Sequence, residues 1–140
     1  MKYTYNKFFE FKINDLNICL DLKERRTVLK TNNNLNCTLL CDAIRNYSKN
    51  SKENILCLNK FDIGKLNMLQ ELQKMNNGLI VIDDADLIFS DELIEDFVLY
   101  DRNNTYLIVS QNFYQTYSQL ASPFINDSNI SIKYLINLVR

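Results

Sequence analysis

The chain has 140 residues, of which 46% are hydrophobic, and its formal net charge at pH 7 is −1. This composition excludes global disorder, because it supplies enough apolar surface for a core. The balanced charge gives no overall attraction to nucleic acid or membranes, and no apolar run approaches the roughly 18 residues of a membrane span. The mixed N-terminal segment does not resemble a signal peptide. We therefore expect one cytoplasmic domain, residues 1–140, without a membrane partner.

The first predicted elements are strands. Residues 2–23 alternate apolar and polar side chains in two runs separated by NDLN, which predicts an antiparallel β-hairpin. The short apolar run at 26–30 predicts a buried strand. A polar turn, TNNNLNCT, follows it. We expect a helix to open on Thr38, because apolar residues recur at helical spacing over 37–47.

Strands and helices alternate along the rest of the chain. We expect strands at 54–59, 79–83, 105–110 and 129–138, and helices at 64–75, 91–100 and 112–120. Ser90 is the expected N-cap of the helix at 91–100. Because parallel strands need crossover connections, the predicted fold is α/β, with a mostly parallel sheet flanked by helices. The antiparallel β-hairpin at 1–23 is then an N-terminal extension of a core at 24–140.

Cysteine and histidine usage argues against a metal site. The four cysteines, Cys19, Cys37, Cys41 and Cys57, form no CxxC pair, and the chain has no histidine. Two thiolates alone make a poor zinc site, so we expect buried free thiols. The lack of histidine also removes Ser–His and Cys–His nucleophile pairs. We predict no metal, no cofactor and no catalytic residue.

The segment at 26–44 has the strand–turn–helix layout of a phosphate-binding P-loop, G-x-x-x-x-G-K-[ST]. Its four defining positions are occupied by Thr31, Asn36, Cys37 and Thr38, and only Thr38 matches.

Two later segments fit the same layout. GLIVIDDADLIF ends an apolar run in Asp83 and Asp84, and YLIVSQN ends another in Ser110 and Gln111. In this order and spacing, the chain from residue 26 to about 137 resembles the P-loop NTPase superfamily, in the compact form carried by mobile elements of low-GC bacteria. The resemblance implies a Walker B-like strand, whose first acid supports Mg²⁺ and whose second activates water, and a sensor strand ending at Ser110.

The resemblance also implies that the site is degenerate. Glycines let a P-loop backbone approach phosphates closely, and the loop lysine reaches the β- and γ-phosphates. Asparagines tolerate the left-handed turn, but Cys37 supplies no charge in place of the lysine. Without it, we expect Asp83 and Asp84 to cap the turn after their strand, and we expect no enzyme. The alternative is a weak nucleotide-binding switch that uses Thr38, Asp83 and Asp84 with Mg²⁺ and a replacement cation.

Residues 83–101 carry eight acidic side chains and no basic one. On the predicted helix, we expect a buried stripe of Leu93, Ile94, Phe97 and Val98. An acidic patch is then expected on the opposite side and at the helix end, formed by Asp91, Glu92, Glu95, Asp96 and Asp101. Such a patch favours a protein partner with a basic surface. The alternative is a solvated face without a partner.

The expected function is that of a non-catalytic pseudo-NTPase that acts by protein–protein interaction. A phage or mobile-element inhibitor of a host defence system, of the anti-CRISPR kind, is one version. The basic residues lack interleaved aromatic side chains, so direct nucleic-acid binding is not expected. A structural or dimerisation module that uses the hairpin edge is a further alternative, and no oligomeric state is predicted.

Overall fold

The computed structural model describes residues 5–13, 16–30, 34–65, 67–110 and 136–139 of the chain. The strands are β1 (Lys7–Ile13), β2 (Leu16–Leu22), β3 (Arg26–Lys30), β4 (Ile55–Leu58), β5 (Leu79–Ile82), β6 (Thr105–Ser110) and β7 (Ile136–Val139). The helices are α1 (Asn34–Lys49), α2 (Met68–Lys74), α3 (Ala85–Ile88) and α4 (Glu92–Tyr100), with a 3-10 turn, η1 (Lys60–Asp62), after β4. No helix among these residues is long and apolar enough to cross a membrane.

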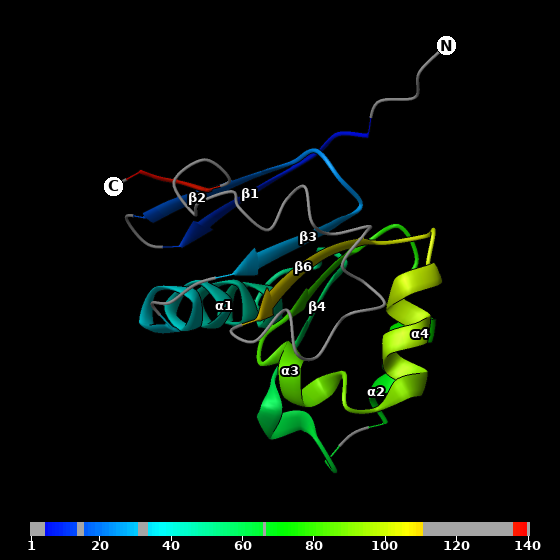
Figure 1. The fold of residues 1–140 in the computed structure, drawn as a ribbon. Coiled ribbons are helices and arrows are strands. Elements are labelled where there is room, and N and C mark those ends of the chain that lie inside the picture. Colours follow the sequence, from blue (N-terminus) through cyan, green and yellow to red (C-terminus); the bar gives the residue numbers. More distant parts are fainter. Residues whose placement is uncertain (1–4, 14–15, 31–33, 66, 111–135, 140) are drawn as a thin grey trace.

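A four-stranded parallel sheet forms the centre of the fold, in the order β3-β6-β5-β4. β3 and β4 follow each other in the chain but lie on opposite edges of this sheet, with α1 as the connection between them. α2 leads back to β5, and α3 and α4 lead on to β6 (Figure 1). The α/β fold with a mostly parallel sheet flanked by helices is therefore confirmed, and each apolar run predicted inside it forms a strand.

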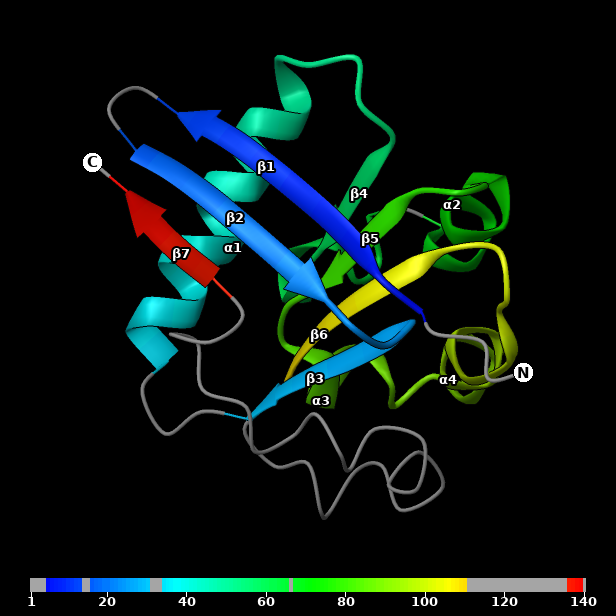
Figure 2. The same ribbon diagram turned by 90° about the horizontal axis from the view of Figure 1, so that it is seen from above.

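The N-terminal hairpin is also confirmed, as β1 and β2 paired antiparallel from Lys7 opposite Leu22 to Ile13 opposite Leu16. β7 lies beside β2 as the third strand of this smaller sheet (Figure 2). The described part of the strand expected at 129–138 is β7, which pairs with β2 and so lies outside the parallel sheet. The helix expected at 112–120 lies outside the described residues.

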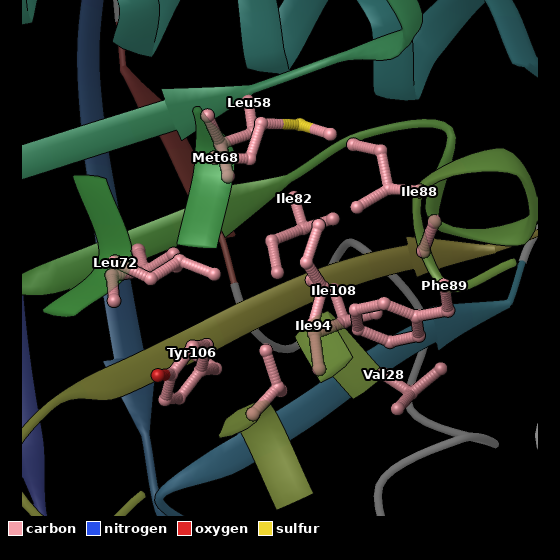
Figure 3. Close-up of a cluster of buried hydrophobic side chains, with 13 residues drawn as sticks. Val28, Leu58, Met68, Leu72, Ile82, Ile88, Phe89, Ile94, Tyr106 and Ile108 are labelled. Carbon is pink, nitrogen blue, oxygen red and sulfur yellow. The ribbon is translucent and has the colours of Figure 1, made fainter. Parts of the chain in front are cut away.

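Hydrophobic cores lie on both faces of the parallel sheet. Helices α2, α3 and α4 cover one face, and their buried side chains meet Val28, Tyr106 and Ile108 from the strands (Figure 3). We call this cluster the α2–α4 core. The other face is covered by α1 and the hairpin, and we call that cluster the hairpin core. Successive residues of β5 enter the two cores alternately, as a pleated strand requires.

The bounds of α2 differ from the prediction. The helix was expected from residue 64, but it begins at Met68 because Asn67 caps it. The Asn67 side chain accepts the Gln70 backbone N–H at 3.1 Å. Met68 and Leu72 are the buried residues of this short helix, so its contribution to the α2–α4 core is limited to one face.

Candidate functional site

The carboxyl edge of the parallel sheet brings together the segments that resemble a nucleotide site. Lys30 pairs with Ser110 and Ile82 pairs with Ile108, so the ends of β3, β6 and β5 lie side by side. From these ends, α1 packs into the hairpin core and α3 packs into the α2–α4 core, on opposite faces of the sheet. In open α/β sheets, ligands bind at the carboxyl ends of strands where the connections that follow neighbouring strands run to opposite faces of the sheet. The edge is therefore the place to test for a nucleotide.

The chain between β3 and α1 has fewer residues than a phosphate-binding loop. Only residues 31–33 separate β3 from α1, so Asn36, Cys37 and Thr38 lie within the first turns of the helix. The prediction that the helix opens on Thr38 is therefore wrong, and Thr31 lies outside the described residues. Asparagine favours helix N-caps as well as left-handed turns, and no glycine in this segment requires a loop. The helix consequently occupies most of the chain that would wrap a phosphate.

Asp83 and Asp84 hold the turn that follows β5. An Asp83 carboxylate oxygen, Oδ1, accepts the Asp84 N–H at 2.9 Å. Asp84 Oδ2 accepts the Lys60 N–H at 3.2 Å, which ties this turn to the start of η1. Asp84 adopts φ 54° and ψ 40°, a left-handed conformation that aspartate tolerates better than most residues. The Asp83 carboxylate therefore makes a local backbone contact within the turn, whereas the Asp84 carboxylate makes no cap hydrogen bond to α3 and contacts η1 instead.

The electrostatics of this edge do not suit a phosphate. Burial raises the pKa of Asp83, and the negative charges of Asp84 and Asp42 raise it further, whereas Lys60 opposes them. An incoming phosphate would face these like charges at short range. Among the residues that the structure describes, no three histidine, cysteine or acidic side chains come together as a metal site.

Other side chains near α1 are already engaged. The Arg45 guanidinium donates to both carboxylate oxygens of Asp62, at 3.0 and 2.9 Å, so it is held away from a phosphate-binding role. Neither Cys41 nor Cys57 forms a disulfide bond; Cys41 is buried, as expected, and Cys57 is half-buried. Burial raises the pKa of Cys57 to about 12, although Arg45 opposes the shift, and the thiol stays protonated at neutral pH.

The orientation of α4 differs from the one predicted for the acidic helix. Ile94 and Val98 are buried as expected, and Phe97 is half-buried. Leu93 was expected in the buried stripe, but it is 66% exposed. Glu95 was expected on the outer side, but it is only 8% exposed. The helix is thus rotated about its axis, so that an acid takes a buried position and a leucine takes an exposed one.

Asp101, the last residue of the predicted acidic patch, is also buried, at 7% exposed. Asp101 Oδ2 accepts the Tyr106 hydroxyl and, at 2.8 Å, the Asn104 side-chain amide, while Oδ1 accepts the Asn103 N–H at 2.8 Å. Burial alone would raise the pKa of Asp101, but these hydrogen bonds and the Arg26 charge outweigh it and lower the pKa. Its place in the surface patch is therefore a wrong prediction, and its contacts are structural.

Arg26 explains how the end of α4 is fixed. From the start of β3, its Nε donates to the Val98 carbonyl at 2.6 Å, and a guanidinium NH₂ group donates to the Asp101 carbonyl. A cation at the carboxyl end of a helix also complements the helix dipole. This role of Arg26 is not among the sequence-based predictions, although a charged side chain at the first position of a buried strand is a signal that it has a partner there.

The exposed side of α4 is a mixed surface of acidic and apolar residues. It consists of Glu92, Leu93, Asp96 and Tyr100, and we call it the outer face of α4. Tyr100 is 74% exposed. The ion pairs found in the described part of the chain involve neither Glu92 nor Asp96.

Asp91 lies at the start of the outer face and caps α4 in place of Ser90. Asp91 Oδ1 accepts the Leu93 N–H at 3.0 Å, whereas the Ser90 hydroxyl donates to the Leu87 carbonyl at 2.7 Å. Asp91 is exposed, so three residues of the predicted acidic patch, Asp91, Glu92 and Asp96, do share the surface.

No model of a known protein family matches the chain. No curated protein and no solved structure compared with the chain matches it either. Its function is therefore inferred from its own residues and their arrangement.

Proposed function

We propose that the protein is a non-catalytic, P-loop-like pseudo-NTPase that acts by binding a protein partner with a basic surface. The outer face of α4 carries this proposal, because Leu93 and Tyr100 are exposed there beside Glu92 and Asp96. Exposed apolar side chains supply binding energy in an interface, and complementary charge speeds and orients association. Together they favour a partner whose apolar contact residues are surrounded by lysine and arginine.

The non-catalytic part of the proposal is supported by the carboxyl edge of the sheet. Cys37 stands where the P-loop lysine would stand, and it lies inside α1. Asp83 and Asp84 accept backbone N–H groups, and the pKa of Asp83 is raised by burial and by neighbouring acids. A nucleotide would have to displace these contacts and bring its own cation.

An inhibitor of a host defence system, carried by a phage or mobile element, is the version of this function that the sequence resemblance favours. Defence proteins that act on nucleic acid have basic channels for the phosphate backbone. The exposed carboxylates of Asp91, Glu92 and Asp96 would compete for such a channel.

Capture of partners from host lysate tests the proposal. The wild-type protein and a Glu92→Lys/Asp96→Lys variant are immobilised, and the captured proteins are compared by mass spectrometry. Both substituted residues are exposed, so folding should be unaffected. We expect one or a few basic host proteins with the wild type and their loss with the variant. Glu95 is unsuitable for this test because it is buried.

The matched control is Glu24→Lys/Asp42→Lys, which changes the net charge by the same amount at two other exposed positions. This control should retain the partner. If both variants lose it equally, only net charge matters and the outer face of α4 is not the site.

A thermal-shift titration tests the absence of a nucleotide site. We expect no change in Tm with MgATP up to the millimolar range, because a ligand stabilises a protein only when it binds the folded state. A reproducible, saturable increase in Tm, or nucleotide retained through purification, would instead support the nucleotide-binding switch.

The hairpin edge favours a second candidate, a dimerisation module. Among the described strands, β1 pairs only with β2, so its other edge is unpaired in that part of the chain. Phe8 on this strand is exposed. An unpaired edge is a template for strand addition by a second copy. Light scattering over a range of concentrations would reveal this, and a Phe8→Lys variant should then remain monomeric.

A further inference from the structure

A pocket of about 230 Å³ lies beside the first turn of α4, between residues 63–69 and residues 87–94. Met68, Ile88 and Ile94 line it and belong to the α2–α4 core, where Figure 3 shows them among the buried side chains. Ile63 and Leu87 line it as well, and they are 45% and 51% exposed. The pocket is thus an open depression of mixed lining, in which these apolar side chains are joined by the polar residues Asn67, Ser90 and Asp91.

The volume suits a single large side chain. An enclosed apolar cavity of about 150 Å³ accommodates a benzene ring. The pocket at 230 Å³ therefore has room for one leucine, methionine or phenylalanine side chain from another molecule. Burial of such a group would also cover Ile63 and Leu87.

The charges around the pocket are distributed unevenly. Asp91 lies in its lining, and Glu92 and Asp96 continue along the adjoining outer face of α4. On the opposite side, Lys60 and Lys65 belong to the segment before α2. A ligand with basic residues on the α4 side of its apolar anchor would complement this arrangement, since opposite charges orient an approaching segment.

The segment that follows β6 in the chain does not offer this chemistry. Residues 111–135, which follow β6 in the sequence, contain Lys133 as their one basic residue and Asp127 as their one acid. A second copy in a symmetric contact would bring Asp91, Glu92 and Asp96 against the same three acids, which is unfavourable. Charge complementarity therefore points to a different molecule.

We propose that this pocket is the anchor site for an amphipathic, lysine- and arginine-rich helical segment of the partner protein. One apolar side chain of the segment enters the pocket between Ile63 and Leu87, and basic side chains one turn away lie against Asp91 and Glu92. Helices bind grooves in this way through apolar anchors at i, i+3 or i+4 and i+7. The inference rests on the proposed function and assigns it a recognition chemistry.

The probe for the test is a fluorescein-labelled helical peptide of leucine and lysine, with its leucines on one face. Two reference peptides have the same composition with scattered leucines, or glutamate in place of lysine. Fluorescence anisotropy gives Kd for the wild type, for Leu87→Asp and for Asn46→Asp, which adds the same charge at an exposed position on α1.

We expect the amphipathic basic peptide to bind the wild type and Asn46→Asp equally, and Leu87→Asp at least about tenfold more weakly. Absence of binding to the wild type, equal binding of the scattered peptide, or equal binding by Leu87→Asp would each overturn the pocket assignment. Because Leu87 is half exposed, the variant should fold. An unchanged circular dichroism spectrum would confirm that Leu87→Asp is folded. If the spectrum changes, Ile63→Asp takes the place of Leu87→Asp in the binding experiment.

The capture experiment separates this inference from the proposed function. If the partner is lost with Glu92→Lys/Asp96→Lys but retained with Leu87→Asp, the acidic surface binds and the pocket does not. If neither variant loses the partner, both proposals are wrong. Loss with each variant supports both.

Discussion

The two sides of α4 reverse the distribution of residues that a surface helix normally shows. The inner side buries Glu95, and the helix ends in the buried Asp101, whereas the outer side exposes Leu93 and Tyr100. The buried Asp101 is explained by the fold, because it is hydrogen-bonded and holds the helix end. The exposed apolar residues contribute little to the fold, and the proposed partner binding would give them a role. The acids on the inner side of α4 and the apolar residues on its outer side therefore indicate different roles for the two sides of the helix.

The largest expected effect comes from comparing neighbouring aliphatic residues on the two sides. Ile94→Ala should lower the free energy of unfolding by about 2–4 kcal/mol, because it removes methyl groups from the α2–α4 core. Leu93→Ala should change it by less than about 0.5 kcal/mol, because its side chain is exposed. Urea denaturation measures both. Similar losses for the two variants would mean that Leu93 and Ile94 are both buried, as the spacing of apolar residues in the sequence predicts.

The next effect concerns the buried network at the end of α4. Asp101→Ala should cost about 1–3 kcal/mol, because the Tyr106 hydroxyl and the Asn104 amide lose their acceptor while buried. Tyr106→Phe should cost about 1 kcal/mol, since the carboxylate keeps its other donors. The double variant should cost less than the sum of the two. Strict additivity in urea denaturation would mean that the two side chains are not coupled.

The pH dependence of Asp101 follows from its lowered pKa. The carboxylate is stabilised in the folded state relative to the unfolded state, where its ordinary pKa is 3.8. Its contribution is therefore present above that pH and is lost as the pH falls towards the folded pKa. Asp101→Asn should be less sensitive than the wild type to acid in this range, measured as Tm against pH.

The parallel sheet could be predicted because its strands are short, continuous apolar runs separated by helical patterns. Residues 54–59, 79–83 and 105–110 each contain one observed strand. The order of strands is not encoded in such runs, because any of them is apolar enough for a central position. The same ambiguity applies to β7, which suits either sheet by composition and pairs with β2.

The rotation of α4 could not be predicted from its spacing. Apolar residues at 93, 94, 97, 98, 99 and 100 surround most of the helix, so several buried stripes are possible. Contacts distant in sequence decide between them, including the Arg26 hydrogen bonds to the end of the helix. Likewise, the asparagine run before Cys37 suits a turn or a helix start, and α1 uses it as a helix start.

The smallest expected effect is a gain in stability on the inner side of α4. Burial raises the pKa of Glu95, and the charges of Asp96 and Glu92 raise it further. The ionised carboxylate of Glu95 is therefore less favourable in the folded protein than in the unfolded chain. Glu95→Gln removes the charge and keeps the shape of the side chain. We expect the free energy of unfolding at pH 7 to increase by up to about 1 kcal/mol. The matched control is Asp96→Asn, whose side chain is exposed and which should change stability less.

The sign of the pH dependence separates Glu95 from Asp101. Above an ordinary pKa of 4.5, the folded wild type binds more protons at Glu95 than the unfolded chain does, so stability decreases as the pH rises through the folded pKa. Between these two pKa values, Glu95→Gln should therefore gain relative to the wild type with increasing pH, and the gain should level off above the folded pKa. A loss of stability at pH 7 would mean that the ionised carboxylate has a stabilising partner inside the fold. The inner side of α4 would then contain two structural acids, and the contrast with its outer face would become stronger.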